Sequence, residues 1–252
     1  MSRFVASAAI IIATLVIASC NNSPTAEKLT GNVSGYVALV NADGTQLSNR
    51  DSVIVTIDQT NYSTMTDSTG YWVFPNIQEG IYTVTYSKAG FGYSKSMQVQ
   101  FTGGGDRDVG YVYLCKPPTF STSAISQRAI PKGGDSASVY ISSTMTDTSV
   151  KGVVKEILFF GKDTAVSWNP AKYTDRSIQT LYCRHGVDTS SIRLTSATLV
   201  NSGFVSGDTV YIAAYTASNG SNNSGYTDLA TGHTVFTDID TVRSNVLKVV
   251  MP

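Results

Sequence analysis

Few residues of this chain have the types and spacing that nucleophilic or metal chemistry requires. Cys183 and His185 stand two apart, so on a strand both side chains would share one face and could form a thiol nucleophile or half of a metal site. The only other histidine is His233. Because zinc normally takes three or four protein ligands, the sequence predicts no metal site here and favours a structural role for the pair.

Motifs of hydrolases and nucleotide-binding proteins are also missing. A serine nucleophile commonly lies in a G-x-S-x-G elbow, and the nearest strings, around Ser34 and Ser206, have the wrong spacing and are typical of turns. Asp228, Asp238 and Asp240 offer oxygens for calcium but lack the ordered ligands of a helix–loop–helix site, so solvated loop carboxylates are expected. We therefore expect no catalytic residues, no metal and no cofactor.

Three aromatic residues near turns are candidate ligand-binding residues. Trp168 and Tyr173 surround a proline turn after an apolar run, and Tyr226 lies in a long polar connection. Exposed aromatic rings can stack on the C–H faces of sugars. The competing interpretation is that Trp168 closes one end of a hydrophobic core, as large aromatic residues near strand ends usually do.

The composition excludes several broad classes. The 252 residues include 18 Lys and Arg against 18 Asp and Glu, without basic runs, which argues against a nucleic-acid partner. Hydrophobic residues make up 42% of the chain, which is unlike a disordered protein. The many tyrosines and glycines suit strands and tight turns, so the chain is expected to be all-β.

Two antiparallel β-sandwiches in tandem are predicted, over residues 30–116 and 119–252. Apolar residues alternate with period two in each segment, with turn signals such as Asp43-Gly44 and Gly103-Gly104-Gly105 between them. Pro117-Pro118 forms the boundary, since two prolines cannot continue a strand ladder. The predicted strands are Val53 to Ile57, Trp72 to Phe74, Tyr82 to Tyr86, Met97 to Phe101, Val109 to Leu114, Ala137 to Ile141, Val153 to Phe160, Ile192 to Leu199, Val210 to Tyr215 and Val246 to Val250.

Two further expectations concern the second segment. Val210 to Tyr215 is apolar on both faces, as in a central strand. The connection from Ala217 to Arg243 is longer than most sandwich loops, and loops of this length are often functional or mobile. Cys115 and Cys183 lie in different predicted domains, so two separate buried thiols are expected rather than a disulfide.

The N-terminal residues have the features of an export signal. Arg3 precedes an apolar stretch of about 11 residues, too short for a membrane span of roughly 20. Ile17-Ala18-Ser19-Cys20 resembles the lipobox of bacterial lipoproteins, which implies cleavage after residue 19, acylation of Cys20 and membrane attachment, with residues 20–29 as a flexible spacer. Asn21 in place of Asp favours the outer membrane of a Gram-negative bacterium, on either its periplasmic or its surface face.

The first segment is similar to a known domain family. Thr66-Asp67-Ser68-Thr69-Gly70-Tyr71-Trp72-Val73-Phe74, Gly80-Ile81-Tyr82 and Ala89-Gly90-Phe91 resemble the carboxypeptidase regulatory-like domain. The resemblance implies a prealbumin-like sandwich of seven strands without catalytic residues; Trp72 stands where Phe is usual. In the second segment, Phe204-x-x-Gly207-x-x-x-Tyr211 is similar to a corner of immunoglobulin-like and fibronectin type III sandwiches.

Three function classes remain open. The first is a non-enzymatic, lipid-anchored binding or scaffolding module whose partner is a polysaccharide or an outer-membrane protein. The second is a fimbrial or assembly subunit that donates its last strand, Val246 to Val250, to a neighbour. The third is a hydrolase with an unrecognised acid–base pair.

Overall fold

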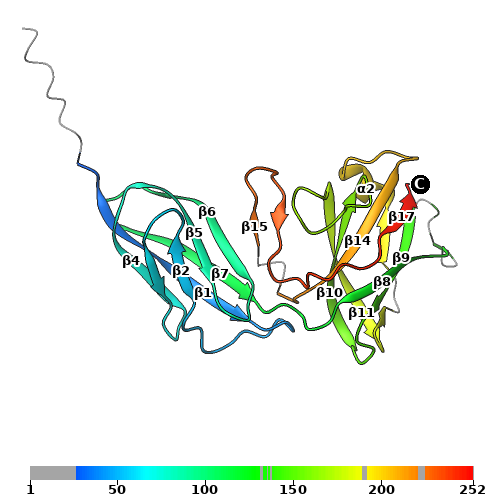
Figure 1. Ribbon diagram of the computed structural model, residues 1–252, viewed down its shortest axis with the longest axis horizontal. Helices are drawn as coiled ribbons and strands as arrows, with labels where there is room; N and C mark the ends of the chain where they lie inside the picture. The colour runs from blue at the N-terminus through cyan, green and yellow to red at the C-terminus, as the bar shows by residue number, and fades with distance from the viewer. Residues whose placement is uncertain are drawn as a thin grey trace, which may run out of the picture.

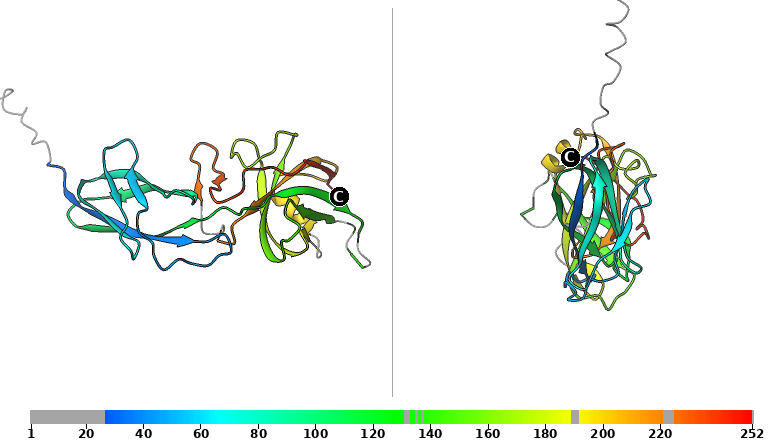
Figure 2. Two further views of the ribbon diagram at one scale, coloured as in Figure 1. Left: turned by 60° about the horizontal axis from the view of Figure 1, so that its bottom comes forward. Right: turned by 90° about the vertical axis from the view of Figure 1, so that its left-hand side faces the viewer.

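The computed structural model describes residues 27–130, 133–134, 136, 138–188, 192–220 and 225–251. Within these ranges every regular element except the short helix α2 (Ser196–Asn201) is a strand, so the expected all-β class is confirmed. The strands form two bodies that lie end to end (Figures 1 and 2). No helix in the described part of the chain has the length and apolarity to cross a membrane. The signal segment and Cys20 lie outside the described residues.

The first sandwich comprises two sheets whose inner faces share one core. Its three-stranded sheet has the order β4-β1-β7 and its four-stranded sheet the order β3-β2-β5-β6. β1 and β7 run parallel, whereas all other pairs are antiparallel. The strands are β1 (Thr30–Val40), β2 (Ile54–Ile57), β3 (Ser63–Met65), β4 (Tyr71–Gln78), β5 (Gly80–Ser87), β6 (Tyr93–Phe101) and β7 (Asp106–Cys115).

The turn before β4 shows how the local sequence determines the backbone conformation in this sandwich. Asp67 Oδ1 accepts hydrogen bonds from the amides of Thr69 (2.8 Å) and Tyr71 (3.0 Å). Gly70 has φ +88°, and a Cβ there would collide with the carbonyl oxygen of Val37, so glycine is required. Gly80, by contrast, has no positive φ; a Cβ there would meet the ring of Tyr82.

The second sandwich is built from one curved sheet of eight strands. Its order is β13-β9-β12-β11-β10-β14-β17, and β8 pairs with β9. β8 also contacts β14 and β17, so the sheet folds over onto itself around an inner core. The strands are β8 (Thr122–Arg128), β9 (Ser138–Met145), β10 (Gly152–Gly161), β11 (Asp175–Arg184), β12 (Val187–Asp188), β13 (Ile192–Thr195), β14 (Thr209–Ala217) and β17 (Leu247–Val250), and the hairpin β15 (Tyr226–Thr227) and β16 (Thr234–Val235) is separate.

The second sandwich has hydrophobic cores on both faces of β10 and β14. Phe160 and Ile212 belong to the inner core, whereas Phe159 and Tyr215 belong to an outer core. The predicted central strand at Val210 to Tyr215 is therefore confirmed, because both of its faces are covered. Residues 162–174 and 228–246 supply the side chains that cover the outer core, including Phe236.

One predicted strand is corrected. The run from Ile192 to Leu199 is β13 only as far as Thr195, after which the chain turns into α2. Thr195 caps the helix, since its side-chain oxygen accepts the amide of Thr198 at 3.2 Å. Leu199 still reaches the inner core, but from a helix. Alternation of apolar residues over such a short run does not distinguish a strand from a helix.

Candidate functional site at the junction of the sandwiches

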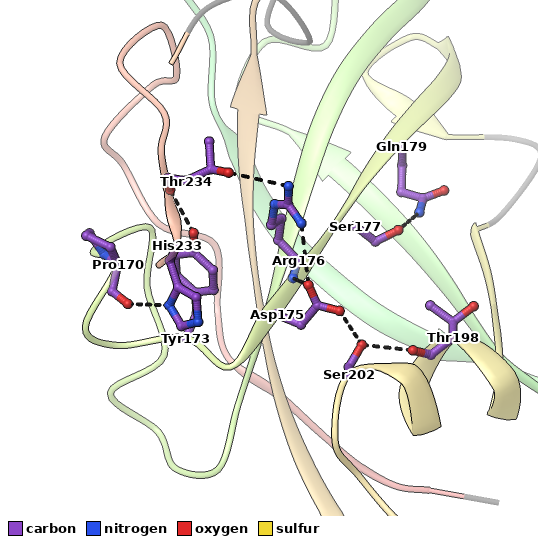
Figure 3. Close-up of polar contacts among 10 residues, drawn as sticks. All are labelled: Pro170, Tyr173, Asp175, Arg176, Ser177, Gln179, Thr198, Ser202, His233 and Thr234. Atoms are coloured by element: carbon purple, nitrogen blue, oxygen red, sulfur yellow. Dashed lines mark hydrogen bonds and ion pairs between the residues drawn. The ribbon is translucent and has the colours of Figure 1, made fainter. Parts of the chain in front are cut away.

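Tyr173 is buried in the outer core rather than exposed for a ligand. Its ring stacks on His233, with centroids 4.5 Å apart and planes at 19°, and lies 4.9 Å from the ring of Phe159. Its hydroxyl donates to the carbonyl oxygen of Thr234 at 2.7 Å (Figure 3). Burial raises its pKa to about 12. With 5% of its surface exposed, Tyr173 offers no ring face to a sugar, and the expectation is corrected.

Trp168 packs against the same outer core and remains half-exposed. The loop that carries it is tied to the β15–β16 hairpin by a 2.6 Å hydrogen bond between His233 Nδ1 and the carbonyl oxygen of Pro170 (Figure 3). At the start of β11, the carboxylate of Asp175 accepts hydrogen bonds from the side chains of Arg176 and Ser202. These contacts support the interpretation that Trp168 closes one end of a core, while part of its surface remains available to a ligand.

Tyr226 lies apart from the other two and contacts the first sandwich. Its hydroxyl is 3.4 Å from that of Tyr93, and Lys95 Nζ lies 5.9 Å from its ring centroid. The same lysine pairs with Asp58 at 2.8 Å. Burial of the ring, followed by the nearby Tyr93 hydroxyl, raises the pKa of Tyr226. The three predicted aromatic residues therefore do not form one site.

The described residues of the long connection 217–243, namely 217–220 and 225–243, hold the two sandwiches together. The amide of Asn219 donates to the carbonyl oxygen of Ala42 at 2.9 Å, and its side-chain nitrogen donates to that of Asp43 at 3.2 Å. Further along, the Thr237 hydroxyl donates to the carbonyl oxygen of Tyr93. Together with Tyr226, these contacts make the connection a structural bridge, which we call the bridging segment.

A pocket of about 320 Å³ opens where the bridging segment leaves β14. Pockets of roughly 300–1,000 Å³ at domain interfaces are the usual sites for small ligands. Its lining combines apolar side chains, among them Phe120, with charged side chains and the amide side chain of Asn219. The lining residues are Ala42, Asp43, Pro118, Phe120, Asp147, Val150, Lys151, Val153, Val154, Lys155, Ala217 and Asn219, so both sandwiches contribute.

Each of the two carboxylates of this junction pocket accepts a hydrogen bond from a backbone amide. Asp43 Oδ1 accepts the amide of Thr45 and Asp147 Oδ1 accepts the amide of Ser149, each at 2.8 Å. The backbone amide of Thr45 is the largest cause of a lowered Asp43 pKa, and hydrogen bonds from Ser149 lower that of Asp147. Both groups are therefore ionised acceptors at neutral pH.

One carboxyl group with a raised pKa does exist, but in the inner core. Glu156 is completely buried and accepts hydrogen bonds from the hydroxyls of Thr122 (2.7 Å) and Ser143 (2.9 Å). Burial raises its pKa to about 7, and Asp188 adds to the shift. Burial also raises the pKa of Cys183 to about 11. These groups are enclosed by the sheet, where a substrate has no access.

The other candidates for chemistry are not brought together. Cys183 is buried in β11, whereas His185 lies beyond its end, exposed and with φ 52°, so the two do not share a face. Asp238 is fully buried, which corrects the expected solvated carboxylate. No cluster of three or more potential metal ligands occurs among the residues with described positions. Cys115 and Cys183 are both buried and do not form a disulfide, as expected.

Sequence reasoning did not identify the pocket. Its residues come from the turn after β1, the segment that follows Pro117, the turn around Asp147, the first half of β10 and the start of the bridging segment. Asp43, Pro118 and Val153 carried signals only for a turn, a domain boundary and a strand. Because the pocket exists only once the bridging segment places one sandwich against the other, no local pattern could reveal it.

Comparison with known proteins adds little to this description. No family model matches the chain, and no curated protein is significantly similar. A solved type II cohesin–X-dockerin complex from Acetivibrio cellulolyticus matches 34% of this chain at 25% identity and TM-score 0.30, and the match spans 58% of that chain.

Two Bacteroides structures match more of the chain at lower identity. A protein from Bacteroides uniformis with a proposed carbohydrate-binding role covers 86% of this chain and 98% of its own at 12% identity. A DUF3823 family protein from Bacteroides ovatus covers 88% and 100% at 11% identity. Both have TM-scores of 0.30, too low to transfer a role. The resemblance of the first sandwich to the carboxypeptidase regulatory-like domain stays a prediction.

Proposed function

We propose that this protein is a lipid-anchored, non-enzymatic binding module of the cell envelope that holds a short glycan in the junction pocket. The observation that carries the proposal is the composition of that pocket. Sugars present apolar C–H faces and a periphery of hydroxyls, and they need an apolar floor with fixed donors and acceptors around it. Phe120 supplies an aromatic ring to the lining, while Asp43, Asp147, Lys155 and Asn219 supply acceptors and donors.

The protonation state of the two pocket carboxyl groups supports binding without catalysis. Acid–base hydrolysis of a glycosidic bond needs one carboxylic acid with a raised pKa beside an ionised partner. Both pocket carboxyl groups have lowered pKa values, so neither is set up to donate a proton. Glu156, which has a raised pKa, is enclosed in the core.

The position at which the chain enters the first sandwich supports attachment to a membrane through the N-terminus. β1 begins at the end of the first sandwich that is remote from the second (Figures 1 and 2). An acyl anchor at Cys20, only ten residues before Thr30, would therefore attach to the membrane at the end opposite to the pocket. The pocket would face away from the lipid surface toward incoming ligand.

The strand-donation alternative has less support. Its proposed donor, β17, already pairs with β14 in the same chain, and Val249 and Met251 fill the inner core. The amide of Met251 also donates to the carbonyl oxygen of Asp208 at 2.8 Å. Donating this strand to a neighbour would expose the core of its own sandwich.

The test uses a soluble form without residues 1–20 and calorimetric titration with neutral and acidic oligosaccharides of two to four sugars. Val153 is half-exposed at the pocket, so Val153→Arg should fill it and abolish binding. Val250→Arg adds the same side chain at an exposed position of β17 and should not change the affinity. Removing the ammonium groups of the lining with Lys151→Ala and Lys155→Ala should weaken binding, whereas Lys248→Ala should not. Equal binding by the Val153→Arg and Val250→Arg variants would contradict the proposal.

A further inference from the structure

The outer face of the three-stranded sheet carries three tyrosines side by side. Tyr36 in β1 is in register with Tyr71 of β4 on one side and with Tyr111 of β7 on the other. The ring centroids are 5.2 Å apart for Tyr36 and Tyr71, and 5.0 Å apart for Tyr36 and Tyr111. We call these three residues the tyrosine row.

The ring geometry shows how the row meets solvent. Tyr36 and Tyr111 have planes at 18°, and their separation is close to the spacing of about 4.8 Å between neighbouring strands. Tyr36 and Tyr71 are partly exposed, so solvent reaches all three residues of the row. Tyr111 belongs to an edge strand and is 61% exposed, so its outer ring face is open.

The hydroxyls of the row are available to a ligand. In the described part of the chain, none of them takes part in a hydrogen bond within the protein, in contrast to the buried hydroxyl of Tyr173. Residues 34–40, 71–78 and 109–115 contain no charged residue, whereas β7 begins with the exposed Asp106, Arg107 and Asp108, and Asp108 pairs with Ser34. The row itself is therefore uncharged, and its ring centroids repeat at about 5 Å.

We propose that the tyrosine row binds a neutral polysaccharide in an extended conformation, with its chain running across the three strands. The centroid repeat of the row is close to the length of one pyranose unit in an extended β-linked chain, so successive sugars meet successive tyrosines. The open face of Tyr111 stacks on a sugar at one end. Asp108, which pairs with Ser34 beside the row, repels acidic chains and so favours neutral ones.

This inference extends the ligand class of the proposed function to long chains, and it rests on a different surface. The lining of the junction pocket contains none of the three tyrosines. A protein whose pocket is blocked by Val153→Arg should still bind through the tyrosine row. Failure of one site therefore does not imply failure of the other.

A purely structural role for the row has a different signature. Cross-strand aromatic pairs stabilise sheets through their rings. Changing Tyr36, Tyr71 and Tyr111 together to Phe keeps the stacked rings and removes only the hydroxyls. If the row serves the fold alone, this variant should match the wild type in every binding assay. If the row binds glycan, affinity falls while thermal stability is preserved.

The experiment is native electrophoresis of the soluble form in gels that contain soluble neutral polysaccharides: hydroxyethyl cellulose, xylan, galactomannan, a β-1,3-glucan and starch. At least one β-linked polymer should retard the protein, and starch, which coils, should not. Tyr111→Ala should lower the affinity roughly tenfold through lost stacking, and the triple Phe variant roughly fivefold per hydroxyl. Tyr182→Ala removes an equally exposed tyrosine of the second sandwich and should change nothing.

Three results would overturn the inference. One is the absence of retardation in all five gels, and another is retardation that is equal for wild type, Tyr111→Ala and the triple Phe variant. The third is loss of retardation in the Val153→Arg variant with the row intact, since this would place long-chain binding in the junction pocket. Thermal unfolding of each variant verifies that lost retardation is not lost folding.

Discussion

The buried carboxyl group of Glu156 should make the stability of the second sandwich depend on pH. Burial raises its pKa in the folded protein from the ordinary 4.5 to about 7, against the opposing effect of hydrogen bonds from Thr122 and Ser143. Asp188 and Cys183 are the titratable neighbours, and the charge of Asp188 raises the pKa further. The folded state therefore binds the proton more tightly than the unfolded state does.

The sign and size of the effect follow from this difference. The stabilisation is fully present below pH 4.5 and is lost as the pH rises through about 7. At 1.36 kcal/mol per pH unit, the loss is roughly 3 kcal/mol. Glu156→Gln cannot ionise, and its amide can still bond both hydroxyls because each can donate or accept. Relative to the wild type, the Gln variant should gain about 3 kcal/mol of unfolding free energy between about pH 4 and about pH 8.

Urea denaturation at a series of pH values measures this change. Fluorescence of Trp168 in a Trp72→Phe background reports on the second sandwich alone, since the chain has two tryptophans. Glu79→Gln removes an exposed carboxyl group of the first sandwich and serves as the matched control. Parallel pH profiles for the wild type and Glu156→Gln would show that Glu156 is not a buried, proton-binding group, and the reasoning would fail.

Three smaller predictions follow from packing. A Cβ at Gly92 would collide with the carbonyl oxygen of Thr237, so Gly92→Ala should speed proteolysis of the bridging segment severalfold. Gly105→Ala is the control: a Cβ there meets nothing within 4 Å, so the rate of proteolysis should not change. Trp72→Phe should reduce the free energy of unfolding by less than about 1.5 kcal/mol, because the buried indole N–H that it removes has no hydrogen-bond partner. A loss above about 3 kcal/mol in urea titrations would contradict this prediction. Burial raises the pKa of Cys183 to about 11, so iodoacetamide at about pH 8 should label this thiol only after the protein unfolds. Labelling of the folded protein at the rate of an exposed thiol would contradict the prediction.

Strand positions in the first sandwich could be predicted because each strand buries one face. Trp72 and Phe74, for example, alternate with exposed or half-exposed neighbours, and both are buried in the core. The parallel pairing of β1 with β7 could not be predicted in this way. Alternation identifies which face of a strand is buried, but it carries no information about which strand lies beside it or in which direction.

The site was harder to predict because aromatic side chains serve cores and ligands equally well. Trp168 and Tyr173 looked like a surface pair beside a turn, yet the second core on the outer face of β10 and β14 takes up both. Tyr36 and Tyr111 showed no local signal, because their contact depends on the register of two strands far apart in the chain. A single sequence places an aromatic residue on a strand face, but only pairing decides whether its neighbours are aromatic too.

The bridging segment shows how composition can conceal a structural role. Its Ser, Thr, Asn and Gly content is typical of a mobile loop, but Val235, Phe236 and Ile239 recur within five residues and are all buried. These anchors fix the segment on the second sandwich, which leaves Asn219 and Thr237 in position to bond the first. The geometry of the junction pocket is therefore set by a few apolar residues within a polar segment. Conservative substitutions at these anchors should weaken the proposed glycan binding, measured by calorimetric titration, before they lower the thermal stability of either sandwich.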